Sequence, residues 1–177
     1  MKKFIYLLPF LIAGLMACGG GETDSESEDT QMGEADQAIK GVETDLSDYG
    51  MPYTITIPDG QAELIIEAFD WGGVQIARGE NFIMSIAYGE GDIDILKFDM
   101  EEDLIYKSEI LEEGDNYIMY KREIPDSGME PEYHFMYVDS GPDEAIEITN
   151  SKDVNYGEEA IRKMLASAKT FKAKAGA

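Results

Sequence analysis

The chain has 177 residues, 44% of them apolar, so it is long enough for one domain with a hydrophobic core and short appendages. Its 37 acidic residues outnumber its 14 basic residues, which gives a net charge of −23 at pH 7. Such a surface repels the phosphates of nucleic acid and excludes nucleic-acid binding as a function class. Solubility is the simplest role of this charge, and binding of cations or basic partners is a second one. The single cysteine excludes an intramolecular disulfide.

The first seventeen residues, MKKFIYLLPFLIAGLMA, have the organisation of a secretory signal peptide. Lys2 and Lys3 form a positive head, and residues 4–17 form an apolar run. This run is too short to cross about 30 Å of hydrocarbon, which takes about 20 helical residues. We therefore expect residues 1–17 to be removed and exclude them from the fold.

The sequence Leu15-Met16-Ala17-Cys18 resembles the lipobox of bacterial lipoproteins. Leucine stands three positions before the cysteine and a small residue directly before it, although Met16 replaces the small residue that is commoner there. The resemblance implies that Cys18 receives a diacylglyceryl thioether, that cleavage occurs before it, and that its amine is acylated, for example with palmitate. The alternative is an ordinary signal peptide with a chance cysteine.

Residues 18–44 are predicted to be a lipidated cysteine followed by a disordered acidic tether. The segment 19–40 carries seven acids, one lysine and almost no large apolar side chain, so it cannot offset the entropy of ordering. In Gram-negative lipoproteins, Asp after the cysteine favours the inner membrane, so the resemblance with Gly19 at this position implies the outer membrane. The acidic string is compatible with export to the cell surface, and a solvating spacer is the alternative.

Residues 45–177 are predicted to form a single α+β domain. Strand-like segments with apolar residues in alternation or short apolar runs follow one another through short turns, which predicts an antiparallel β-meander sheet. A central helix and a C-terminal helix packed on one face complete the expected fold. Strands are expected at 52–60 (with its closing turn), 63–70, 74–78, 82–88, 106–113, 117–124, 133–139 and 145–150, and helices at 91–104 and 155–174.

The central helix is predicted from one apolar face and a cap. Ile93, Leu96, Met100 and Leu104 follow helical spacing, and Asp92 precedes them as an N-cap. The start of the segment, DIDI, also alternates as a strand does, so a strand remains the alternative.

The C-terminal helix is predicted from a capping-box pattern and an apolar stripe. Asn155 is followed three residues later by Glu158, as in a capping box. Acids lie near the expected start and lysines near the expected end, which matches the helix macrodipole. The stripe consists of Ile161, Met164, Leu165, Ala168 and Phe171.

Two short stretches are similar to PsbP-like domains. They are the turn Ile57-Pro58-Asp59-Gly60, after a strand, and the segment 165–171, LASAKTF, in the final helix. The resemblance implies a related α+β fold and carries no shared active site, so it adds no function. A two-fold β₄α repeat is another possible organisation, because the two halves have nearly equal length.

The only histidine, His134, is the first candidate for catalysis. No cysteine or second histidine is at hand to complete a zinc site with it, and the sequence has no Gly-x-Ser-x-Gly elbow. A Ser-His-Asp arrangement assembled in space stays open. A strand histidine without a catalytic role is the preferred interpretation.

The acidic clusters and the single tryptophan are the other candidates. Glu90, Asp92 and Asp94 surround Gly89-x-Gly91 and could offer oxygens to Ca²⁺, but their spacing is not that of an EF-hand, and a turn with a helix cap is the simpler interpretation. The clusters at 99–103 and 140–144 are interpreted as solvated surface, with paired-carboxylate chemistry as the alternative. Trp71 is expected to pack in the core or a turn, and an exposed binding aromatic is the alternative.

The sequence thus predicts an envelope lipoprotein of the outer membrane, anchored in the bilayer through acylated Cys18. Its domain is expected to be a non-catalytic binding or structural module without a cofactor, metal site or nucleic-acid partner. An envelope hydrolase using carboxylate or Ser/His chemistry is the main alternative, and Ca²⁺-dependent adhesion is a third hypothesis.

Overall fold

The computed structural model describes residues 39–89, 91–140 and 144–174. All of them belong to the second of two compact units, Gln37–Ala177. The expected signal peptide, Cys18 and most of the expected tether lie outside the described residues.

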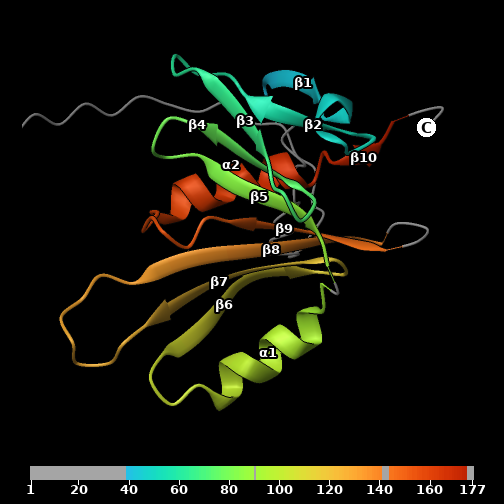
Figure 1. The fold of residues 1–177 in the computed structure, drawn as a ribbon. Helices are drawn as coiled ribbons and strands as arrows, with labels where there is room; N and C mark the ends of the chain where they lie inside the picture. The colour runs from blue at the N-terminus through green and yellow to red at the C-terminus, as the bar shows by residue number, and fades with distance from the viewer. Residues whose placement is uncertain (1–38, 90, 141–143, 175–177) are drawn as a thin grey trace, which may run out of the picture. The chain divides into compact units, whose positions relative to one another are not determined.

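Ten strands, two α-helices and one short 3₁₀ helix make up the described part of the chain (Figure 1). The helices are η1 (Ser47–Tyr49), α1 (Ile93–Glu102) and α2 (Glu158–Ala168). The strands are β1 (Gly41–Asp45), β2 (Tyr53–Pro58), β3 (Leu64–Ala68), β4 (Val74–Arg78), β5 (Ile83–Tyr88), β6 (Lys107–Gly114), β7 (Tyr117–Glu123), β8 (Glu132–Ser140), β9 (Ala145–Asn150) and β10 (Lys172–Ala173).

Seven strands form one antiparallel sheet in the order β3-β4-β5-β9-β8-β7-β6. Two meanders, β3-β4-β5 and β6-β7-β8-β9, are joined where β5 pairs with β9, with Ile86 opposite Ile148. The α+β class, the antiparallel sheet and every strand expected from the sequence are therefore confirmed. The meander connections follow from the short glycine-containing turns between neighbouring strands.

Strand β2 leaves this sheet and forms a three-stranded one with β1 and β10. Strand β1 starts at Gly41, so order begins inside the range 18–44 that was assigned to the tether. Its sequence, GVETD, has one large apolar residue, and pairing with β2 supplies the order that the sequence pattern did not indicate. The two-fold repeat is not supported, because β2 leaves the large sheet whereas its counterpart β6 stays in it.

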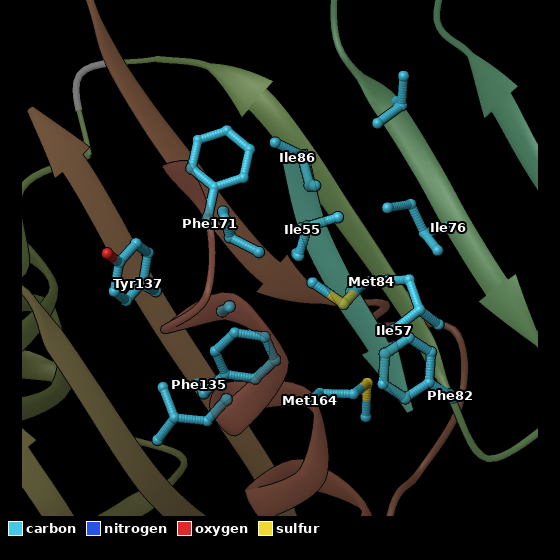
Figure 2. Packing of buried hydrophobic residues seen from close by; sticks show 14 of the residues in the cluster. Ile55, Ile57, Ile76, Phe82, Met84, Ile86, Phe135, Tyr137, Met164 and Phe171 are labelled. Carbon is cyan, nitrogen blue, oxygen red and sulfur yellow. The ribbon is translucent and has the colours of Figure 1, made fainter. Parts of the chain in front are cut away.

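Helix α2 packs between one face of the large sheet and β2, as the apolar stripe predicted. Figure 2 shows apolar side chains of the large sheet, β2 and α2 pointing into a shared core. The hydroxyl of Ser167 donates to the carbonyl of Thr56 at 2.5 Å, and the amide of Thr56 donates to the hydroxyl of Thr170 at 2.8 Å. Among the described residues, every buried core residue lies between positions 46 and 171, so the unit 37–177 contains a hydrophobic core of its own.

The ends of α2 differ from the expectation. Gly157 is the N-cap residue and no side chain caps the helix, so the predicted Asn155 cap is wrong. The helix ends at Ala168, and Phe171 reaches the core from the segment that follows, where its ring stacks on Tyr53 with 4.7 Å between ring centroids. The aromatic contact and the β10 pairing that follows it end the helix earlier than periodicity suggested.

Helix α1 lies against the opposite face of the large sheet. Glu112 and Glu113 are neighbours in β6, so their side chains point to opposite faces. Glu112 pairs with Arg162 and Lys169 at the α2 side, whereas Glu113 pairs with Lys97 of α1. Helix α1 therefore packs beside the edge strand β6, away from the main core, and contains no buried residue.

Candidate functional site

His134 lies in β8 and is held from both sides by neighbouring side chains. Its Nδ1 is 3.2 Å from Nδ2 of Asn150, and its Nε2 is 3.4 Å from a carboxylate oxygen of Glu132. An amide nitrogen can only donate, so Nδ1 accepts and the proton of the neutral ring resides on Nε2. The carbonyl oxygen of the Asn150 side chain accepts from the backbone N–H of Phe135 at 3.0 Å. The histidine and asparagine thus form one buried hydrogen-bonded pair.

The charges around this pair keep the imidazole neutral. Burial lowers the pKa of His134, and the nearby Arg122 guanidinium lowers it further. Burial works to raise the pKa of Glu132, but hydrogen bonds from Arg122 at 2.7 Å and its positive charge bring that pKa below its usual value. Arg122 also lies over the ring of Tyr106, with its guanidinium carbon 4.4 Å from the ring centroid. Glu132 is therefore occupied by Arg122 and is not free to act as a base.

A hydrolytic site would also need a nucleophile beside His134. Among the described residues, no hydroxyl group is hydrogen-bonded to His134. The ring of Tyr120 lies 5.4 Å from the imidazole between centroids, and burial raises the pKa of its phenol. A protonated phenol and an imidazole with both nitrogens engaged favour a structural role over general base catalysis.

The start of α1 is built as a capped turn. An oxygen of Asp92 accepts from the backbone N–H groups of Asp94 at 2.8 Å and Ile95 at 3.1 Å, so the predicted N-cap is confirmed. Gly91 has φ +35°, and a Cβ there would lie 3.1 Å from a methyl carbon of Val138, so glycine lets the chain pass close to β8.

An open cleft of about 640 Å³ lies beside this turn. Asp92, Asp94, Glu113 and Asp115 line it, but Glu113 is paired with Lys97. Over the ranges that the structure describes, no group of three or more His, Cys, Asp or Glu side chains is placed to hold a metal ion. Glu90 and residues 141–143 of the second acidic cluster lie outside those ranges.

Trp71 lies in the turn between β3 and β4, with 70% of its surface exposed. Its ring stacks on that of Phe69 with 4.7 Å between centroids and 9° between ring planes. Gly73 follows with φ +99°, and a Cβ there would lie 2.4 Å from the carbonyl oxygen of Ile86. The ring thus lies in a turn, as one of the two expected placements had it, but it is largely exposed, as in the alternative, and is not part of the core.

A groove of about 660 Å³ lies between the C-terminal half of α1, the loop after it and β6. Met100, Leu104, Ile105 and Ile110 provide its apolar lining. Leu104 is 99% exposed and Ile105 is 64% exposed. Leu104 was predicted to lie on the apolar face of the helix, and that prediction is wrong, because α1 ends at Glu102 and the chain turns away.

Asp103 fixes this turn. Its side chain accepts from the backbone N–H groups of Ile105 at 2.8 Å and Tyr106 at 2.9 Å. These hydrogen bonds lower the pKa of Asp103, so the carboxylate stays charged and keeps the loop in this shape. Leu104 and Ile105 are thus displayed by an ordered turn. In the sequence, this turn is indicated by an aspartate followed directly by two apolar residues and a strand. The helical spacing of the apolar residues before it predicts a longer helix and hides this local turn pattern.

No family model, curated protein or solved structure matches the chain. In the described part of the chain, no helix combines the length and the apolar character needed to cross a bilayer.

Proposed function

We propose that the chain is a lipid-anchored envelope protein whose folded unit is a non-catalytic binding module. The observation that carries the binding role is the groove beside α1, where an ordered turn holds Leu104 and Ile105 in solvent. Exposed apolar side chains that gather around a groove are typical of interaction sites and costly to keep on a free surface.

The hydrogen bonds of His134 support binding over hydrolysis. A general base needs a nitrogen lone pair directed at a hydroxyl group or a water. Here the lone pair of Nδ1 receives the Asn150 amide, and Nε2 faces Glu132. His134, the only histidine, therefore gives no specific support to the hydrolase alternative.

The anchor is proposed from the lipobox-like sequence at Leu15-Met16-Ala17-Cys18. Each buried methylene group contributes about 0.8 kcal/mol to membrane binding, so two or three acyl chains on one residue hold a protein stably. The bilayer is then the first partner of the chain, through Cys18. Gly19 after the cysteine favours the outer membrane, on its periplasmic face or at the cell surface.

Metabolic labelling with palmitate in a Gram-negative host tests the anchor. The natural chain should be labelled, and Cys18→Ala should not be. Met16→Ala is the matched control, because it places a small residue where lipoboxes commonly have one and should preserve labelling. Labelling of the Cys18→Ala chain would disprove the anchor.

A further inference from the structure

The C-terminal end of α1 carries more negative charge than a helix end tolerates well. Glu101 and Glu102 close the helix, Asp103 follows it, and no basic residue lies in the last turn. The carbonyl groups at this end already give it a partial negative charge, so acids here are destabilising and cations are favoured. The sequence thus works against the stability of its own helix at this position, which is expected where function requires it.

These acids are also free to bind. Asp99, Glu101 and Glu102 form no ion pair with any residue that the structure describes. Other acids around the domain are engaged, for example Glu109 with Lys121 at 2.7 Å. Acids elsewhere on the domain, such as Glu67 and Glu147, also form no ion pair with a described residue, but Asp99, Glu101 and Glu102 fall within four residues at the end of α1.

One of these free acids lines the apolar groove. Glu101 lines the groove together with Met100, Leu104 and Ile105. Phe98, 62% exposed, lies one helical turn before Glu101 and extends the apolar surface along α1. Lys97 and Lys107 also line the groove, but Lys97 is neutralised by Glu113. The groove therefore has an apolar floor and a rim of mixed charge, with the acids Glu101 and Asp103 at the end of α1 and Lys107 on β6.

Building on the proposed binding role, we propose that this groove docks a basic amphipathic peptide segment of a partner protein. Apolar side chains of the segment enter between α1 and β6 and contact Leu104 and Ile105. Lysine or arginine side chains of the segment pair with Glu101 and Glu102 and compensate the negative end of α1. The partner thereby supplies the charge that the helix lacks.

A second copy of the chain and a lipid surface fit this groove less well. Pairing two copies through their β6 edges would bring Glu109, Glu112 and Glu113 of one strand close to the same acids of the other, and like charges directly opposite are destabilising. Anionic lipid headgroups would be repelled by the acids at the end of α1. A basic peptide meets complementary charge and an apolar floor at once.

Binding of a labelled model peptide to the unit 37–177 tests this proposal, because that unit contains its own core. The probe is a Leu/Lys peptide of about 18 residues with its leucines on one helical face. Fluorescence anisotropy measures the dissociation constant at several salt concentrations. A Leu/Glu peptide with the same apolar face and a Leu/Lys peptide of scrambled order serve as comparison probes, and both should bind at least about tenfold more weakly.

Two variants separate the apolar and the charged contributions. Leu104→Ser with Ile105→Ser should weaken binding about tenfold or more, as for the central residues of an interface. Glu101→Gln with Glu102→Gln should weaken binding and reduce its dependence on salt. Ile65→Ser on β3, the opposite edge of the sheet, is the matched control for an exposed isoleucine and should bind as the natural chain does. All substituted side chains are exposed, and thermal unfolding checks that each variant is folded.

Several outcomes would overturn the proposal. They are absence of binding by the Leu/Lys peptide, equal binding by the scrambled or Leu/Glu peptide, and unchanged binding by the Leu104→Ser, Ile105→Ser variant. Binding of the unit to zwitterionic phosphatidylcholine vesicles that is lost in this variant would assign the groove to a lipid surface instead. Self-association that is lost in it would assign the groove to a second copy. Palmitate labelling of Cys18 does not depend on any of these results, so the anchor and the groove can fail separately.

Discussion

At the scale of single residues, the environment of His134 determines its protonation. The side chain is 6% exposed, one ring nitrogen accepts from Asn150 and the other faces Glu132. Glu132 favours the charged imidazolium, but burial and Arg122 oppose it and prevail. The folded state therefore binds the proton more weakly than the unfolded chain does.

This difference predicts that acidification destabilises the protein. Because the pKa of His134 is lowered from its ordinary value of 6.5 in the folded state, the neutral ring contributes stability at pH above 6.5. That contribution is progressively lost as the pH falls below 6.5 towards the lowered folded-state pKa. His134 is the only histidine, so NMR titration of its ring protons reports it directly. A titration midpoint at or above 6.5 would contradict the assignment, and His134→Gln should flatten the change in unfolding free energy between about pH 7 and pH 5.5.

Asn150 is predicted to be a strong determinant of stability. Asn150→Ala leaves the backbone N–H of Phe135 and Nδ1 of His134 without their partner in a buried site. Leaving a buried polar group unsatisfied costs about 1–3 kcal/mol, so the unfolding free energy in urea should fall by this amount. Asn155→Ala is the control, because Asn155 is exposed and does not cap α2, and it should change stability by less than about 0.5 kcal/mol. Equal effects of the two substitutions would contradict the role of Asn150.

At the scale of helices and strands, local sequence patterns predicted the features that depend on neighbouring residues, such as strand positions and helix caps. Strands such as β2, with buried Tyr53, Ile55 and Ile57 in alternation, are recognisable because their pattern reflects a buried and a less buried face. The Asp92 cap was recognisable because capping acts within one turn. Long-range pairing was not recognisable. One of the two partners of β2 is β10, more than 100 residues later, and no local pattern indicates this pairing.

The groove was missed for a different reason, because two local signals compete where α1 ends. Leu104 continues the helical spacing of Leu96 and Met100, so periodicity places it on the apolar face of the helix. The turn fixed by Asp103 ends the helix before Leu104. The local hydrogen bonds of Asp103 stabilise the turn more than the apolar face of α1 stabilises a longer helix, because that face buries little area. The groove therefore depends on where α1 ends. The ends of a helix are the features that are hardest to predict from a sequence.

Asp92→Ala is predicted to loosen α1 specifically. The substitution removes the acceptor for the N–H groups of Asp94 and Ile95, and loss of a cap costs about 0.5–2 kcal/mol. Because α1 has no buried residue, the cost should appear mainly as local opening. Hydrogen exchange should become faster across residues 93–102 and stay unchanged in α2. Asp99→Ala, an exposed acid within the helix, should leave exchange in α1 nearly unchanged or slower.

Glu102→Lys is predicted to stabilise the free protein. A lysine at the C-terminal end of α1 interacts favourably with the helix dipole, and such a charge reversal contributes about 0.3–1 kcal/mol. Hydrogen exchange in α1 should therefore slow down, while the Leu/Lys peptide binds more weakly. A Glu102→Lys variant that exchanges faster would contradict the electrostatic conflict inferred at this helix end.

At the scale of the whole molecule, the core and the expected anchor are separate in the sequence. The buried core residues of the described ranges lie between positions 46 and 171, whereas the lipobox-like residues end at Cys18. Without residues 1–17 the chain would carry 12 basic and 37 acidic residues, a net charge of −25. Charge of this size keeps the surface hydrated and favours basic partners over anionic ones.

The last prediction concerns where the folded unit begins. A fragment of residues 37–177 should unfold thermally at the same temperature as residues 18–177 carrying Cys18→Ser, since the core side chains of the described residues all lie within the unit 37–177. A fragment of residues 46–177 should melt lower by more than about 3 °C, because it loses β1. Without β1, the edge of β2 loses a five-residue ladder, and Lys172 and Lys174 lose Glu43 and Asp45 as ion-pair partners.

Circular dichroism of the three chains at equal concentration measures their melting temperatures. Equal melting temperatures for all three would mean that β1 adds nothing to the fold, and a loss already at residues 37–177 would mean that the acidic segment packs on the domain.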